Sequence, residues 1–142
     1  MTKYFDLLPR ERPLVVFGTR DLDDRGLVFR TLKELTASFT RCRVLLRTDS
    51  PTARTKGPER LAEEWASKQW FHLRLYFPHP KARDDLAVAR EMVEDATAGG
   101  TRKAYMVGFV RRGSTDPFVK AMTKFAGTFD AKLKLVKYSY ED

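Results

Sequence analysis

LVVFGTRD, residues 14–21, joins a continuously apolar run to a glycine and then to a polar turn. The β-branched and aromatic side chains of this run are typical of a buried strand, which Gly18 ends. Beyond the turn, apolar residues recur at near-helical spacing from Asp23 to Phe39, with Asp23 as the expected N-cap. A strand followed directly by a helix is the first half of a βαβ unit.

The same alternation continues along the chain. Proline is favoured at the first position of a helix and aspartate just before it, so we expect Pro58 to begin the second helix, and Asp116 and Pro117 to begin the fourth. Five strands that alternate with four helices predict an α/β fold: a single Rossmann-like domain whose mostly parallel sheet is covered by helices on both faces. The expected strands are residues 14–17, 43–47, 70–77, 103–110 and 132–138, and the expected helices are residues 23–39, 58–69, 82–98 and 117–127.

Charge within the strands predicts their order. The first and fourth strands are continuously apolar, as central strands covered on both sides should be. The third alternates Leu73 and Leu75 with His72 and Arg74, and the fifth alternates leucine with lysine, which is typical of edge strands. This pattern predicts the order 3-2-1-4-5 in one domain over residues 13–142, preceded by an N-terminal extension over residues 1–12.

Composition narrows the class of protein. The chain has 142 residues and a net charge of +8, which favours an anionic partner such as a nucleotide, a nucleic acid or an acidic protein. No apolar run approaches the roughly 20 residues of a membrane helix, and residues 1–13 have no signal-peptide core, so we expect no membrane and a cytoplasmic location. Cys42, the single cysteine, is expected to be a buried hydrophobe. We expect no metal and no cofactor, and leave a homo-oligomer open.

The polar turns after the first and fourth strands predict the ligand site. In an open α/β sheet, ligands bind beyond the carboxyl ends of the strands at the point where the winding reverses, here between these two strands. Both turns lead into helix N-termini that favour an anion, and glycine and arginine suit a bound phosphate. The expected ligand-binding residues are Gly18, Thr19, Arg20, Arg111, Arg112, Gly113, Ser114 and Thr115, together with Arg54, Lys56 and Gly57 in the loop after the second strand.

Four motifs, in order, resemble the SLOG superfamily, and in particular its small YspA/YpsA-like branch. They are Gly18-Thr19-Arg20-Asp21, GPERLAEEWA at residues 57–66, Arg90-Glu91-Met92-Val93, and residues 109–115. The resemblance covers about residues 13–138. It implies a Rossmann-like fold that binds nucleotides or nucleotide-derived molecules, and it adds Arg90 to the expected ligand-binding residues. Some members of that superfamily cleave N-glycosidic bonds of nucleotides, others only sense ligands, and one distant relative binds single-stranded DNA.

The chain departs from this superfamily at the phosphate-binding turn. Arg111 and Arg112 replace glycines of the motif Pro-Gly-Gly-x-Gly-Thr, and Phe118 stands where the hydrolytic branch has a glutamate. Binding is therefore favoured over hydrolysis. Glu59 and Glu91 are the candidate catalytic carboxylates, although Glu59 also suits a helix N-terminus and Glu91 a helix surface. The alternatives are a nucleotide N-glycosidase and a nucleic-acid-binding protein that uses the basic rim.

Overall fold

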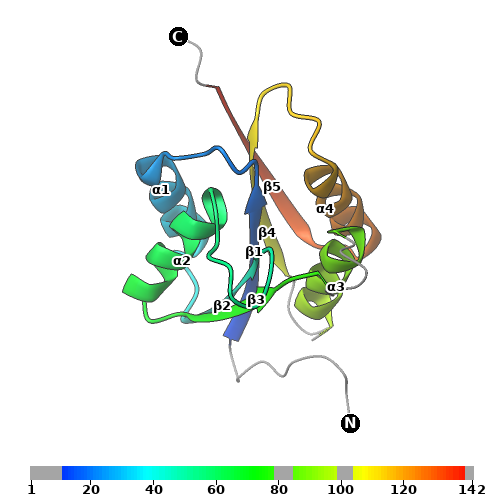
Figure 1. Cartoon of the computed structure of the whole chain (residues 1–142). Helices are drawn as coiled ribbons and strands as arrows, with labels where there is room; N and C mark the ends of the chain where they lie inside the picture. The colour runs from blue at the N-terminus through cyan, green and yellow to red at the C-terminus, as the bar shows by residue number, and fades with distance from the viewer. Residues whose placement is uncertain (1–10, 79–84, 99–103, 140–142) are drawn as a thin grey trace.

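Strands and helices alternate along the chain (Figure 1). The computed structural model describes residues 11–78, 85–98 and 104–139. The strands are β1 (Glu11–Gly18), β2 (Arg41–Arg47), β3 (His72–Tyr76), β4 (Tyr105–Arg111) and β5 (Lys132–Tyr138). The helices are α1 (Arg25–Leu35), α2 (Pro58–Lys68), α3 (Asp85–Thr97) and α4 (Pro117–Thr128). Of the predicted helix 82–98 and strand 103–110, residues 82–84 and 103 lie outside the described residues.

The five strands form one parallel sheet with β1 at its centre. Their order is β3-β2-β1-β4-β5, and every neighbouring pair is parallel. Helices α1 and α2 cover one face and α3 and α4 cover the other (Figure 1). Leu14 and Val16 of β1 pack in the α1–α2 core, while Val15 and Phe17 pack in the α3–α4 core. The predicted α/β Rossmann-like fold and strand order are confirmed.

Capping side chains fix two of the helix starts. Helix α4 begins as predicted, because the Asp116 carboxylate accepts a hydrogen bond from the Phe118 N–H at 2.8 Å and Pro117 follows it. The predicted cap of α1 is wrong by one residue: Asp24, not Asp23, accepts from the Leu27 N–H, at 3.0 Å. None of the helices within the described ranges is long and apolar enough to cross a membrane.

Strand β1 begins earlier than predicted. It starts at Glu11, so residues 11 and 12 belong to the sheet and not to an N-terminal extension. A carboxylate can lie at the start of a central strand because two partners meet it. The Arg43 Nε lies 3.2 Å from Glu11 Oε1, and the His72 Nδ1 lies 2.8 Å from Glu11 Oε2.

Strand β3 is shorter than predicted because Trp70 belongs to the end of α2. Gln69 caps the helix, the Trp70 N–H donates to the Ser67 carbonyl, and the Phe71 N–H donates to the Ala66 carbonyl. This is the Schellman pattern, whose residue after the cap takes a left-handed conformation and is usually glycine. Trp70 accordingly has a φ of 60°, and its side chain points into solvent with 91% exposure.

Replacing Trp70 with glycine is therefore expected to stabilise the domain by about 1 kcal/mol, because glycine adopts the left-handed conformation without the steric cost that a Cβ imposes. Urea unfolding followed by circular dichroism measures the difference. Gln69→Gly is the matched control, since Gln69 has a φ of −93° and gains nothing from glycine. A Trp70→Gly variant that is less stable than the wild type would contradict this assignment.

Candidate functional site

The loops that follow β1 and β4 meet at the carboxyl edge of the sheet. Gly18 is in register with Phe109, and the Thr19 N–H donates to the Phe109 carbonyl at 2.9 Å. The Arg111 N–H donates in turn to Thr19 Oγ1 at 3.0 Å. The chain winds outward from β1 through β2 to β3 and then returns through α3 to β4, so this edge is the point where the winding reverses. The structure thus brings together the two loops that the sequence singled out.

A hollow of about 540 Å³ lies between these loops. Its donors come mainly from the second loop, where Gly113 takes a φ of 81°. Among the described residues, nothing accepts a hydrogen bond from the N–H groups of Gly113 and Thr115, and no side chain pairs with the Arg112 guanidinium. The lining residues are Thr19, Asp21, Arg111, Arg112, Gly113, Ser114, Thr115 and Ser139.

Arg111 and Asp21 form a fixed contact at the rim of the hollow. Arg111 Nη1 lies 2.7 Å from Asp21 Oδ2, and the Tyr138 hydroxyl donates to the other carboxylate oxygen of Asp21. The Tyr138 carbonyl also accepts from the Arg112 N–H at 2.8 Å, so the end of β5 orients the second loop. Tyr138 was not among the expected site residues, because the sequence does not show that its hydroxyl points toward Asp21 in the loop after β1.

Arg20 and Lys56 lie together, and both form ion pairs with the carboxylate of Asp49. The Arg20 guanidinium donates two hydrogen bonds to Asp49, at 2.6 and 3.0 Å, and Lys56 Nζ lies 3.1 Å from the same carboxylate. The Arg20 hydrogen bond is the main cause that lowers the pKa of Asp49 to about 2, and Lys56 adds to it. Asp49 therefore remains charged and neutralises part of the predicted phosphate-binding charge.

Gly18 and Gly57, two of the expected ligand-binding residues, lie in close contact with neighbouring segments of the chain. A Cβ on Gly18 would lie 2.2 Å from the Phe109 carbonyl oxygen and 2.9 Å from the Pro58 Cγ. Gly57 has a φ of 58°, and a Cβ there would lie 2.8 Å from the Arg20 backbone. Both glycines are buried, and they allow the start of α2 to pack directly on β1 and its loop.

Glu59 and Arg47 form a buried pair beneath the same edge. Glu59, in the first turn of α2, is 1% exposed, and Arg47, at the end of β2, is 5% exposed. Arg47 Nε lies 3.9 Å from Glu59 Oε2, Arg47 Nη1 lies 3.8 Å from Asp85 Oδ2, and the guanidinium carbon lies 3.7 Å from the centre of the Phe118 ring. Arg47 therefore connects the first turns of three helices.

Burial dominates the electrostatics of this pair. It raises the pKa of Glu59 to about 8, although Arg47, the Glu59 backbone N–H and Arg20 act in the opposite direction. Burial also lowers the pKa of Arg47, against the attraction of Glu59 and Asp85. For both residues, the effect of burial on the pKa outweighs the attraction between the two side chains.

Three further expected site residues do not line the hollow either. Arg90 pairs with Glu94 at 2.7 Å, and its guanidinium lies over the Phe129 ring, beyond the far end of α4. Glu91 faces Asp95 and Arg74, and burial is the main cause that raises its pKa. Arg54 lines a separate hollow of about 600 Å³ along α2.

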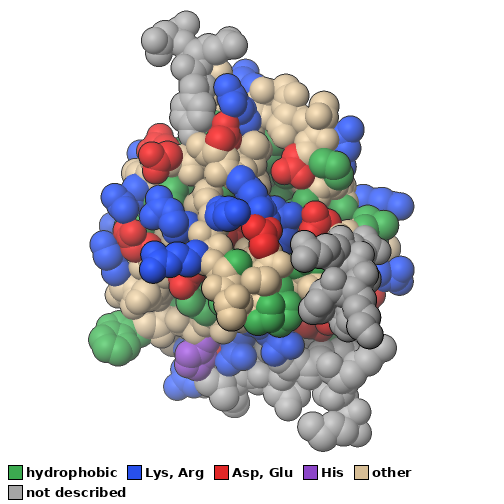
Figure 2. All heavy atoms as spheres, viewed as in Figure 1, with side chains coloured by type: hydrophobic (Ala, Val, Ile, Leu, Met, Phe, Trp, Pro, Cys, Tyr) green, Lys and Arg blue, Asp and Glu red, His purple; other side chains and the backbone are tan. Residues whose placement is uncertain are grey.

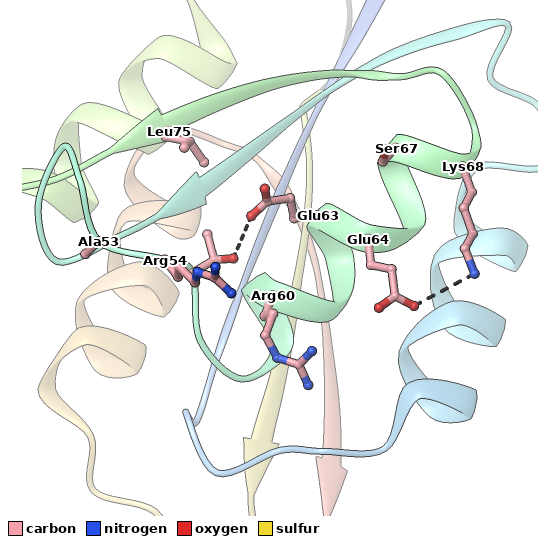
Figure 3. Close-up of a pocket in the computed structure, with 9 residues that line it drawn as sticks. Ala53, Arg54, Arg60, Glu63, Glu64, Ser67, Lys68 and Leu75 are labelled. Atoms are coloured by element: carbon pink, nitrogen blue, oxygen red, sulfur yellow. Dashed lines mark hydrogen bonds and ion pairs between the residues drawn. The ribbon is translucent and has the colours of Figure 1, made fainter.

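The hollow along α2 has a mixed charge (Figure 3). Glu63 accepts a hydrogen bond from the Thr55 hydroxyl at 2.6 Å, and Glu64 lies 3.9 Å from the Lys68 ammonium. Arg60 pairs with Asp23 at 3.6 Å. Figure 2 likewise shows acidic side chains interspersed with basic ones over this side of the molecule, so its net charge is smaller than the number of lysines and arginines suggests.

The fold and this edge together define a Rossmann-like α/β domain with a polar crevice at the reversal point of its sheet. Comparisons with protein-family models, curated proteins and solved structures gave no match to the chain. Within the described ranges, no three His, Cys, Asp or Glu side chains are placed to hold a metal ion. The function must therefore be inferred from the chemistry of the crevice.

Proposed function

We propose that the protein binds a phosphate-bearing, nucleotide-type small ligand in the hollow between the loops after β1 and β4. The observation that carries this proposal is the set of donors before α4: two backbone N–H groups without an acceptor among the described residues, at Gly113 and Thr115, and the Arg112 guanidinium beside them. Phosphate oxygens only accept hydrogen bonds, so they match such donors. The N-terminus of α4 adds a favourable dipole.

Hydroxyl groups extend the donor set. Ser114 Oγ accepts a hydrogen bond from the Asp116 N–H at 3.2 Å, and Thr19 Oγ1 accepts one from the Arg111 N–H. Because each hydroxyl oxygen acts as an acceptor in these bonds, its proton can be donated to a phosphate oxygen. Thr115 lines the same hollow. Together with the Arg112 guanidinium, these groups can surround a single phosphate group. The arginine side chain would then hold the phosphate where the glycines of the superfamily motif use backbone amides.

A small ligand is favoured over a nucleic acid by the distribution of charge. Arg20 and Lys56 are neutralised by Asp49, and Arg111 is paired with Asp21. A phosphate backbone needs a continuous basic track, whereas the hollow needs only a local excess of donors. Binding is also favoured over N-glycosidic cleavage: Glu59 is buried, Glu91 lies elsewhere, and Asp21 is engaged by Arg111 and Tyr138. The resemblance to the SLOG superfamily agrees with this proposal and remains a prediction.

The Arg112→Ala variant is expected to weaken the binding of adenosine monophosphate by about tenfold, because it loses one hydrogen bond between charged groups. Isothermal titration calorimetry of the wild type and the variant measures this change. Circular dichroism should show an unchanged fold, since the Arg112 side chain is exposed.

Arg30→Ala is the matched control, because it removes the same charge from an exposed position on α1. This variant should bind the nucleotide as the wild type does. Equal losses in both variants would mean that only net charge matters. In that case, a short oligonucleotide whose affinity falls steeply with salt would support the nucleic-acid alternative.

A further inference from the structure

Strand β3 is an open edge of the sheet. It pairs with β2 on one side, and no strand in the described ranges pairs with the other side. The Tyr76 carbonyl accepts a hydrogen bond from the Thr48 N–H, just beyond β2, at 2.7 Å. Because the backbone groups of alternate residues in a strand point to the same side, those of Arg74 also face β2. The N–H and C=O groups of Leu73 and Leu75 therefore face outward, and no described residue binds them.

Apolar side chains lie exposed along this edge. Leu75 is 42% exposed, and it points from β3 into the hollow of about 600 Å³ along α2 (Figure 3). Phe77, which follows the strand, is 39% exposed. Native proteins seldom leave apolar side chains beside unpaired strand groups, because such an edge pairs readily with another chain. Their exposure at β3 indicates a surface that pairs with another strand.

The opposite edge of the sheet is protected against pairing. Strand β5 has three lysines among its seven residues, and lysine on an edge strand opposes the addition of another strand. Strand β3 has a single arginine and no lysine. That arginine, Arg74, is held by its own neighbours, because its Nε donates to the Tyr76 hydroxyl at 3.1 Å and lies 3.9 Å from Asp95 Oδ2. The two edges therefore differ, and β3 is the one that remains able to pair.

The charge around β3 favours an acidic partner strand. Arg54 is exposed at the hollow, and no described side chain forms an ion pair with it. The hollow is lined by three basic and two acidic side chains, which are Arg54, Arg60, Lys68, Glu63 and Glu64. A second copy of the chain fits less well, because antiparallel pairing over all of β3 would place Arg74 opposite Arg74. Two chains of charge +8 would also repel each other.

We propose that β3 is a docking edge for an extended segment of another protein that carries both apolar and acidic side chains. The segment pairs with the outward N–H and C=O groups of Leu73 and Leu75 and adds a strand to the five-stranded sheet. An apolar side chain of the segment packs on Leu75 in the hollow, and an acidic one lies beside Arg54. This edge shares no lining residue with the hollow of the proposed ligand site, so the inference goes beyond the proposed function.

The test measures the affinity of a fluorescently labelled peptide, Val-Val-Glu-Glu repeated twice, by fluorescence anisotropy. This order places valine and glutamate on both faces of an extended strand. The wild type should bind the peptide, and Leu75→Pro should bind it at least about tenfold more weakly, because proline removes the outward N–H. We expect this variant to fold, since proline is tolerated on an edge strand where the N–H faces solvent.

Leu135→Pro is the matched control on the protected edge. Leu135 is 40% exposed. The Lys132 N–H donates to the Ala104 carbonyl on the β4 side, so by alternation the backbone of Leu135 faces outward from β5. This variant should bind the peptide as the wild type does. A Leu75→Pro variant that binds as tightly as the wild type, or an equal loss in both proline variants, would overturn the docking edge.

Two measurements on the wild type decide the matter if Leu75→Pro fails to fold. The same peptide with methylated backbone amides should lose its affinity, and Val-Val-Lys-Lys repeated twice should bind about tenfold more weakly than the acidic peptide. Equal binding of the methylated peptide would overturn strand pairing, and equal binding of the basic peptide would overturn the acidic partner. A wild type that binds none of these peptides would overturn the proposal, and a stable dimer in sedimentation would identify a second copy as the occupant in its place.

Discussion

The Gly18→Ala variant is expected to lose more than about 3 kcal/mol of its free energy of unfolding, a large share of the roughly 5–15 kcal/mol of a typical domain. The added Cβ would lie 2.2 Å from the carbonyl oxygen of Phe109. That oxygen belongs to the neighbouring central strand and accepts the Thr19 N–H bond, so it cannot move without separating β1 from β4. Urea denaturation followed by circular dichroism measures the loss.

Gly127→Ala provides the matched control. Apart from the chain neighbours of Gly127 and the backbone of its own helix, no described atom lies within 4 Å of the Cβ that this substitution would add, and Gly127 is in the last turn of α4. Alanine is a better helix former than glycine, so this variant should be as stable as the wild type or more stable by up to about 1 kcal/mol. If Gly18→Ala unfolded at the same urea concentration as the wild type, the close contact between Gly18 and the Phe109 carbonyl of β4 would be refuted.

The sequence was sufficient to predict the sheet, because the apolar pattern of each strand reflects its position. Continuous burial in the run LVVF of β1 and alternation in β5 distinguish the centre from the edge. The meeting of the two loops then follows from topology, since the carboxyl ends of neighbouring parallel strands share one edge. Trp70 was wrongly placed in the third strand because its aromatic side chain is typical of a strand. The Schellman pattern is defined by backbone hydrogen bonds and usually has glycine at this position.

The partners of the charged side chains could not be predicted in the same way. Arg20 and Asp49 are 29 residues apart in the sequence, and Arg111 and Asp21 are 90 residues apart. Such pairs depend on side-chain directions across different loops, which composition and periodicity do not specify. The close packing at Gly18 could not be predicted for a similar reason: glycine allows close approach of any neighbour, and only the fold places the Phe109 carbonyl and Pro58 there.

Glu59 shows the same limit at the candidate site. Its position at the start of α2 predicts a charge that suits the helix dipole or a candidate catalytic carboxylate. In the structure it is 1% exposed, because Arg47 of β2 and neighbouring side chains from other elements enclose it. Burial of this kind is contributed by residues distant in the sequence, so it becomes visible only in the fold.

The Glu59→Gln variant is expected to become more stable than the wild type as the pH rises from 5 to 8. Burial raises the pKa of Glu59 from 4.5 to about 8 in the folded chain. Between these two values the unfolded chain releases the proton while the folded chain retains it, so the wild type loses stability as the pH rises. Glutamine is neutral throughout and avoids this loss, which should reach a few kcal/mol at pH 8. Urea unfolding at several pH values measures both curves.

Glu64→Gln is the control for the titration, because Glu64 is a surface carboxylate on the same helix. Hydrogen bonds from Arg25 hold the pKa of Glu64 below its ordinary value, so this substitution should give no gain in stability between pH 5 and 8. Parallel curves for the wild type and Glu59→Gln would mean that Arg47 fully compensates the buried carboxylate. A gain confined to Glu59→Gln would instead show that the burial of this carboxylate costs stability as the pH rises.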